Sequence, residues 1–329
     1  MRSLGYCGAV SEQQPEAADG GSLLTVLIAL GANVLIAIAK SVVAALTGSA
    51  SMVAEAAHSW ADAANEVFLV IAERRAAKPA DDEHPYGHGR EAFVWSLFAA
   101  VGLFAAGAVV SVWHGVVTLL GGVGEGETDY LWAYVVLGVA LVLEGISFLQ
   151  ARRQTKRLAE RAGLGTLPFI VRTSNPTLRA VFFEDAAALI GILLAGGGIA
   201  LHQVTGDARW DAGGSIAVGL LLGVLAIFLI ARNRELLVGE AASPEVRERA
   251  LAALAEDPRV ERVTLLHIEI VGPAHVLVIA AVDLVGDAVE HDVAVTLHDI
   301  ATQIEQRERV ARAFITLSRP GDRALGNAP

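Results

Sequence analysis

Residues 52–66 read MVAEAAHSWADAANE and lie within a long apolar part of the chain. At 100° per residue, Glu55, His58, Asp62, Asn65 and Glu66 fall on one helical face about 100° wide. A charge at the centre of a bilayer costs about 2.5 to 3.5 kcal/mol even on the mildest scale, so this face must look into protein or a water-filled cavity. The stretch therefore predicts a membrane-embedded helix with a polar, functional face.

The composition around this stretch is that of a membrane protein. Of 329 residues, 54% are hydrophobic and 19% are charged, and the mean hydropathy is +0.51. A span needs roughly 20 mostly apolar residues, and runs rich in Ala, Leu and Val are typical of helices. Six such spans are predicted, at residues 22–47, 50–74, 92–120, 130–151, 179–202 and 211–232.

Charge and cysteine content exclude several kinds of protein. The net charge of -11 argues against a nucleic-acid partner. The only cysteine, Cys7, can form neither an internal disulfide nor a multi-thiolate metal site, so any metal must be held by His and carboxylate groups. Residues 1–21 have no signal-peptide pattern and are expected to be a disordered tail before a transmembrane domain at 22–239.

Basic residues mark one side of the membrane. They concentrate between the second and third spans and between the fourth and fifth, whereas the opposite connections carry almost none. The positive-inside rule then predicts that both termini are cytoplasmic. The expected location is the bacterial cytoplasmic (inner) membrane.

The composition changes after Glu240. Residues 240–329 carry 15 acidic and 9 basic side chains, and their pattern predicts helix, strand, strand, helix and strand. This order is typical of a small cytoplasmic α+β domain, ferredoxin-like, with an antiparallel sheet. The predicted fold class is thus an all-α bundle of six transmembrane helices followed by an α+β domain.

The polar face of the second span suggests a metal site. His58 and Asp62 are four residues apart, so both can reach one ion, and this mixture suits zinc. A structural hydrogen-bonded pair between helices is the alternative reading of this spacing. Glu184 and Asp185, near the start of the fifth span, favour the metal site, because two helices with buried carboxylates need a shared cation, shared protons, or both.

The sequence also resembles the cation diffusion facilitator family of metal transporters. The resemblance rests on the first two spans and on KPADDEHPYGHGREAF at residues 78–93. It implies a homodimer that exports a divalent metal, usually zinc, against protons, with His58 and Asp62 as ligands. Val181 stands where relatives often have His, so Asp185 is expected as third ligand and Glu184 as fourth ligand or close neighbour.

The resemblance extends to the loop and the C-terminal domain. Asp81, His84 and His88 match positions that bind a further zinc in some relatives. In the C-terminal domain, positions that hold a dinuclear zinc site in some relatives are Thr264, Ala280, Leu317 and Arg319 here. A dimerisation domain without metal sensing of that type is expected.

The predicted mechanism is competition between metal and protons for the same ligands, because metal binds only deprotonated groups. The carboxylate-rich fifth span leaves iron, cobalt and manganese open as substrates. A membrane sensor or scaffold that does not transport is another alternative. An enzyme is not expected, since a metallohydrolase of the H-E-x-x-H type has no counterpart in the sequence.

Overall fold

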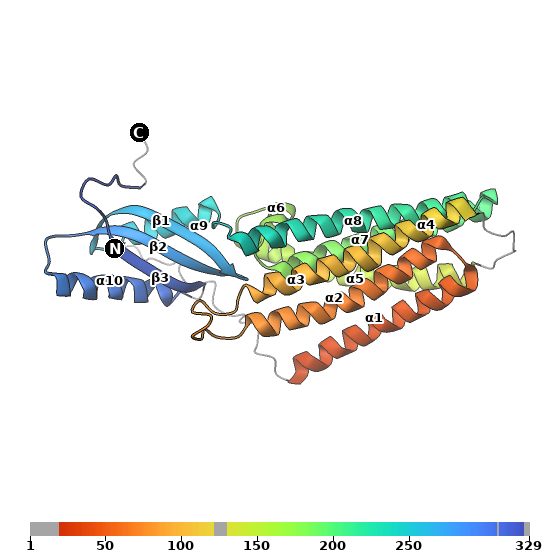
Figure 1. Ribbon diagram of the computed structural model, residues 1–329, viewed down its shortest axis with the longest axis horizontal. Coiled ribbons are helices and arrows are strands. Elements are labelled where there is room, and N and C mark those ends of the chain that lie inside the picture. The colour runs from red at the N-terminus through yellow and green to blue at the C-terminus, as the bar shows by residue number, and fades with distance from the viewer. Residues whose placement is uncertain (1–19, 122–129, 308, 326–329) are drawn as a thin grey trace.

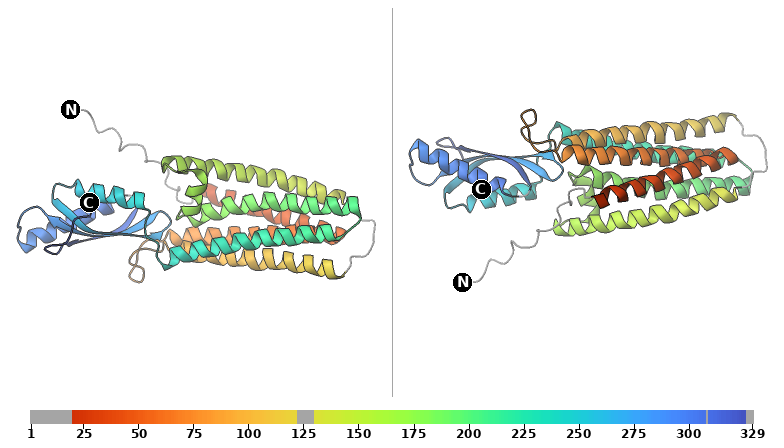
Figure 2. Two further views of the ribbon diagram at one scale, coloured as in Figure 1. Left: turned by 90° about the horizontal axis from the view of Figure 1, so that it is seen from above. Right: turned by 90° about the horizontal axis from the view of Figure 1, so that it is seen from below.

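The computed structural model describes residues 20–121, 130–307 and 309–325, with side chains from residue 30 onward. A long helical bundle lies at one end and a small α/β domain at the other (Figures 1 and 2). Most of the predicted tail, residues 1–19, lies outside the described residues. The first helix already begins at Gly20, inside the range expected to be tail.

The bundle contains the predicted spans. Its elements are α1 (Gly20–Thr47), α2 (Ala50–Ala76), α3 (Glu91–Gly102), η1 (Leu103–Val109), α4 (Val110–Gly121), α5 (Leu131–Arg161), α6 (Thr166–Arg172), α7 (Pro176–Thr205) and α8 (Arg209–Val238). The segments α3, η1 and α4 follow one another without a break, and η1 is a π-helical stretch within this third span. The short α6 was not predicted.

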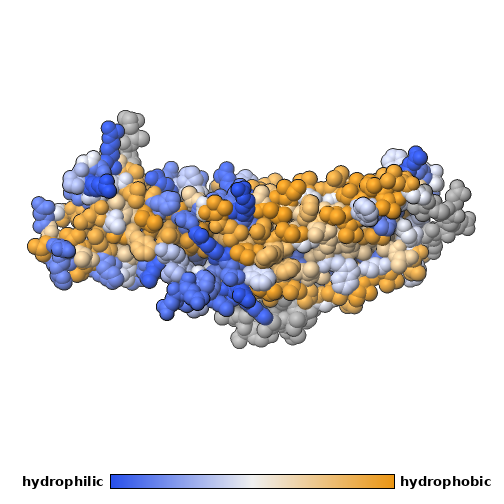
Figure 3. All heavy atoms as spheres, in the orientation of Figure 1, coloured by the Kyte–Doolittle hydropathy of each residue, from blue (hydrophilic) through white to orange (hydrophobic). Residues whose placement is uncertain are grey.

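Five of the described helical segments are long and apolar enough to cross a membrane. The sixth span is α2, which has 27 residues and a length of about 40 Å but carries the polar face. Apolar side chains cover much of the visible bundle surface, and hydrophilic ones gather where the bundle meets the C-terminal domain (Figure 3). The predicted six-helix membrane bundle is confirmed.

Asp211 of α8 fixes the end of α2 that lies farthest from the C-terminal domain. Its carboxylate accepts hydrogen bonds from Ser49 Oγ at 2.8 Å, from the Ala50 backbone N–H at 2.6 Å and from the Ser51 backbone N–H at 3.1 Å. These donors belong to the first turn of α2, whose N–H groups have no partner within the helix. A Cβ at Gly214 would lie 2.6 Å from Ser51 Oγ, so α2 and α8 are in close contact at this end.

The C-terminal domain has the predicted order of elements. They are α9 (Pro244–Ala255), β1 (Val260–Gly272), β2 (His275–Leu284), α10 (Glu290–Glu305) and β3 (Val310–Leu317). The strands lie in the order β1-β2-β3, with β1 and β2 antiparallel but β2 and β3 parallel. The expectation of a wholly antiparallel sheet is wrong, because α10 is a crossover helix that returns the chain to the end where β2 began.

The loop between α2 and α3 contacts the C-terminal domain. A Cβ at Gly89 would lie 2.8 Å from the Cα of Gly272, so the two backbones touch. Arg90 forms an ion pair with Glu269 of β1, with Nη2 and Oε1 2.5 Å apart. This contact joins the bundle to the turn between β1 and β2.

A substitution at Gly89 tests this contact. Gly89→Val would push backbone against backbone, and we expect it to destabilise the protein by about 1–3 kcal/mol, as overpacking does. The midpoint of thermal unfolding of the purified protein should fall. Gly138→Ala is the control, because a Cβ there has no neighbour within 4 Å. An unchanged midpoint in Gly89→Val would show that the domains do not pack in this way.

Candidate functional site

A cavity of about 140 Å³ lies between α1, α2, α5 and α7. Five carboxylate side chains from three of these helices line it, namely Asp62 and Glu66 of α2, Glu144 of α5, and Glu184 and Asp185 of α7. The sequence predicted that the second and fifth spans would bring carboxylates to the same depth, and the structure has them around one space. Such a concentration of acidic groups inside a membrane bundle needs positive charge or protons.

Hydrogen bonds between helices hold three of these carboxylates. Asn33 of α1 donates to Glu66 Oε1 at 2.7 Å, and Ser147 of α5 donates to Asp185 Oδ2 at 2.7 Å. The Asn65 side-chain amide donates to Glu184 Oε2. Each bond fixes one oxygen of a carboxylate and leaves the other available to a further partner.

Three carboxylate oxygens of this cavity have no hydrogen-bond partner among the described residues. Asp62 Oδ1, Glu66 Oε2 and Glu184 Oε1 are buried acceptor atoms without a hydrogen bond. A buried acceptor without a donor is costly, so these atoms are expected to meet a cation, a proton or water. The cavity therefore has the chemistry of a cation site.

His58 lies behind this cavity and does not line it. Its side chain is 1% exposed, against 22% for Asp62, and its Nδ1 lies 3.4 Å from Asp62 Oδ1. Both ring nitrogens lack a hydrogen-bond partner in the described structure. The His58 side chain points into the protein, and its Nδ1 is close enough to Asp62 for both residues to bind one ion after a small movement of the imidazole.

The predicted ligands His58, Asp62, Glu184 and Asp185 do not converge tightly in this conformation. Over the ranges that the structure describes, one group of three His, Cys, Asp or Glu residues has its ligand atoms within 4.8 Å of one another, and that group is in the loop. The span residues Glu66, Glu144, Asn33 and Ser147 join the cavity although they were not among the predicted ligands. Their signal in the sequence is the same as that of Asp62, a polar side chain inside an apolar span.

A buried ion pair lies about two turns of α2 from Asp62, on the side away from the C-terminal domain. Lys40 Nζ of α1 is 2.8 Å from Glu55 Oε2, and the two side chains are 1% and 0% exposed. The second oxygen, Oε1, has no hydrogen-bond partner in the described chain and faces Gly191 of α7, where a Cβ would lie 2.9 Å away. The ammonium of α1 thus balances one carboxylate of the polar face of α2.

The tight group in the loop is formed by Asp81, His84 and His88, as the resemblance implied. His84 Nδ1 lies 3.1 Å from Asp81 Oδ1, and His88 Nε2 lies 2.9 Å from Asp81 Oδ2. The two imidazole rings are 4.0 Å apart between centroids. Two imidazoles and one carboxylate with an open solvent side fit the donor set of a zinc site.

The hydrogen bonds of Asp81 give a pH prediction. The side chain of His88 and then the backbone N–H of His84 lower the pKa of Asp81 from its ordinary value of 3.8 to about 2. The hydrogen-bonded loop should thus be fully formed above about pH 4 and be lost as the pH falls towards 2. Carbon NMR of labelled Asp81 should give this low pKa, and His88→Ala should raise it. The same pKa in both proteins would contradict the assignment.

The comparison with known families settles what kind of protein this is. The model of the cation efflux transmembrane domain matches residues 26–238. The chain belongs to the cation efflux family. This confirms the resemblance to cation diffusion facilitators, which are a family of transporters.

Relatives of this cation efflux protein carry informative names. It is 33% identical over 281 residues to the mitochondrial proton-coupled zinc antiporter SLC30A9 of Xenopus laevis. The aligned region covers 84% of this chain and 50% of that protein. The mouse protein of the same name is 34% identical over 72% of this chain and 42% of its own length. Metal tolerance protein C4 of Arabidopsis thaliana is 35% identical, over 82% of this chain and 59% of that protein. The chain thus spans about half the length of these curated relatives.

These relatives correct the expected location. The sequence was assigned to a bacterial cytoplasmic membrane, but the animal proteins that match most of this cation efflux chain are named as mitochondrial. The assignment to the bacterial cytoplasmic membrane is wrong. We therefore call the side of the membrane on which the C-terminal domain lies the domain side.

Proposed function

We propose that this protein exchanges a divalent metal ion, zinc first of all, for protons across an organellar membrane. The observation that carries the proposal is the carboxylate cavity between α1, α2, α5 and α7, with acceptor atoms that no described donor satisfies. The names of the SLC30A9 relatives, proton-coupled zinc antiporters, support the same ion and the same coupling.

In this proposal Asp62 and Asp185 bind the metal, and Glu184 is a further ligand or adjoins the ion. His58 joins them when α2 moves relative to α7, because its Nδ1 already lies 3.4 Å from Asp62 Oδ1 without a hydrogen bond. The metal site of an alternating-access transporter must rearrange to release its ion. A conformation with loosely gathered ligands is consistent with a state from which metal enters or leaves.

Protons and metal compete for these oxygens. Without metal, several carboxylates in one small cavity repel one another and hold protons. An arriving ion can bind only as protons leave, and protons from the other side later displace it. If the cavity opens to the two sides in turn, this competition couples metal movement to a proton gradient.

The other regions have supporting roles in the proposal. Asp81, His84 and His88 form a metal-gathering site at the domain side, close to where the loop contacts the C-terminal domain. The C-terminal domain pairs with a second copy to form a homodimer. Neither role requires a metal within the C-terminal domain.

A second substrate class has one observation in its favour. His58 does not line the cavity. Every candidate metal ligand that does line it is therefore a carboxylate oxygen. Oxygen donors suit harder ions, so iron, cobalt or manganese is the alternative to zinc.

Reconstituted vesicles test the function. With protein in vesicles that contain a metal-sensitive dye, an imposed pH gradient should drive uptake of zinc, and collapse of the gradient should stop it. Parallel runs with cobalt, iron and manganese, and with Asp185→His, test whether ligand type sets the choice of ion. Absence of gradient-driven uptake for all four metals would overturn the proposal.

A further inference from the structure

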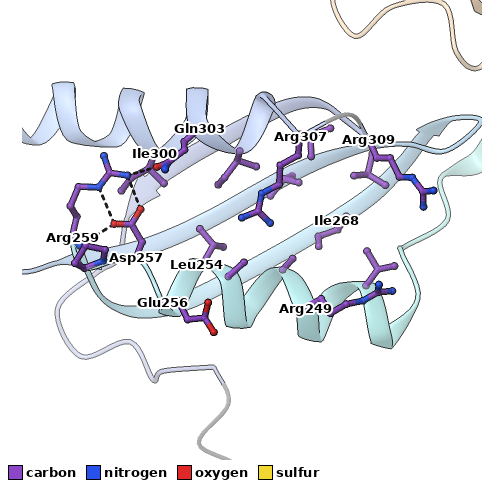
Figure 4. Close-up of a pocket in the computed structure, with 18 residues that line it drawn as sticks. Arg249, Leu254, Glu256, Asp257, Arg259, Ile268, Ile300, Gln303, Arg307 and Arg309 are labelled. Atoms are coloured by element: carbon purple, nitrogen blue, oxygen red, sulfur yellow. Dashed lines mark hydrogen bonds and ion pairs between the residues drawn. The ribbon is translucent and has the colours of Figure 1, made fainter. Parts of the chain in front are cut away.

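A second and larger cavity lies in the C-terminal domain. It has a volume of about 860 Å³ and lies over the sheet between α9 and α10 (Figure 4). We call it the α9–α10 groove. Its floor is apolar and is formed by Leu254, Ile268, Val276, Val278, Ile300 and Ile304.

One end of the groove is closed by side-chain hydrogen bonds (Figure 4). Arg259 donates to Asp257 from Nε at 2.9 Å and from Nη2 at 2.6 Å, and its Nη2 also donates to Gln303 of α10 at 2.7 Å. These bonds tie the turn after α9 to α10. The floor at this end is therefore sheltered.

Three arginines line the groove away from this closed end, Arg249 on α9 and Arg307 and Arg309 at the turn into β3 (Figure 4). All three are exposed, and none forms an ion pair with a carboxylate among the described residues, although Arg249 Nε donates to the backbone carbonyl of Glu245 at 3.1 Å. The domain carries 15 acidic side chains for 9 basic ones, so three neighbouring guanidinium groups without a carboxylate partner among the described residues are not a result of local composition. The groove thus combines an apolar floor with three positively charged side chains away from its closed end.

We propose that the α9–α10 groove binds a soluble amphiphilic anion, an acyl chain with a carboxylate or phosphate head group. The volume lies in the range of ligand pockets, which are mostly apolar with a few polar groups that fix orientation. Guanidinium groups bind carboxylate and phosphate through paired hydrogen bonds. The acyl chain of the ligand would lie on Ile268, Val278 and Ile300. Its anionic head group would bind the three arginines.

Binding would have a structural consequence for the domain. The ligand would contact both α9 and α10. Without it, these two helices are connected through the sheet and through the hydrogen bonds of Arg259. The same sheet carries the β1–β2 turn that touches Gly89 of the bundle. An acyl anion would thus stiffen the element against which the bundle packs.

The experiment uses the full chain in nanodiscs of neutral phosphatidylcholine and hydrogen–deuterium exchange measured by mass spectrometry. Dodecanoate and dodecyl phosphate should slow exchange in α9 and in the turn from α10 to β3, and dodecanol should do so much less. The variant R249A/R307A/R309A should weaken the effect of both anions by about tenfold or more. Arg312→Ala is the matched control, since Arg312 pairs with Glu305 and does not line the groove.

A second variant separates binding from folding. Ala253→Trp fills the groove and keeps every arginine, so it should abolish the effect of both anions while exchange elsewhere in the domain stays unchanged. The proposal is overturned if dodecanol protects as well as dodecanoate, or if the triple-arginine variant responds like the parent. It is also overturned if the groove is protected without ligand in proportion to protein concentration, because a second copy then covers it. Protection by phosphatidic acid in the nanodisc without added anion would assign the groove to membrane lipid and overturn a soluble ligand.

Discussion

Asp62→Asn is expected to reduce gradient-driven zinc uptake into vesicles by at least about 100-fold, the scale on which even residues that support metal ligands act. Asp62 combines three properties that no other residue of the polar face combines. It lines the cavity, it has a buried oxygen without a hydrogen bond, and this oxygen lies 3.4 Å from His58 Nδ1. The asparagine keeps the size of the side chain but loses its charge, so the site loses both a metal ligand and a proton acceptor.

The control for this result is Glu73→Gln on the same helix. Glu73 is exposed near the domain-side end of α2 and does not line the cavity, so uptake in this variant should match the parent. Equal uptake by Asp62→Asn and the parent would remove the cavity from the transport path. Loss of uptake in both variants would mean only that acidic residues on α2 affect transport in general.

Removal of one partner of the buried pair Lys40–Glu55 is expected to destabilise the protein by about 3–5 kcal/mol, since the other charge is left alone inside the bundle. Lys40→Met and Glu55→Gln should therefore each lower the midpoint of thermal unfolding. The double variant Lys40→Met/Glu55→Gln should recover most of the loss, because no unpaired charge remains. Additive losses in the double variant would show that the two side chains do not act as a pair.

This pair also separates two readings of the polar face. Glu55 lies on the same helical line as His58 and Asp62, so a carboxylate there could be taken for another metal ligand. The contact of 2.8 Å with Lys40 instead gives it an internal cation. Together with the hydrogen bonds that Asp211 accepts, it ties α1, α2 and α8 together in the half of the bundle away from the domain side.

Much of the bundle could be predicted because the sequence of a single helix shows which of its faces contacts lipid and which contacts protein. The apolar runs gave the spans, and the periodicity of residues 52–66 gave the polar face of α2. Carboxylates in α7 could be related to that face because both must avoid lipid. The pairing of β3 was missed because strand direction depends on the path of α10, which periodicity does not contain.

The detailed site could not be predicted for a similar reason. A helical projection gives the direction of a side chain but not its neighbour, so it could not distinguish Asp62, which lines the cavity, from His58, which lies behind it. It likewise could not assign Lys40 to Glu55 across two helices. The compartment was missed because the charges of the loops give an orientation in a membrane and do not identify the membrane.

Proton release on metal binding shows whether metal and protons occupy the same cavity in turn. The protein should carry His84→Ala and His88→Ala, so that the loop group does not contribute. Zinc is then added in weakly buffered solution while a pH-sensitive dye records the change. We expect release of about one or two protons for each bound zinc, and clearly fewer in Asp62→Asn. Tight zinc binding without proton release would contradict it.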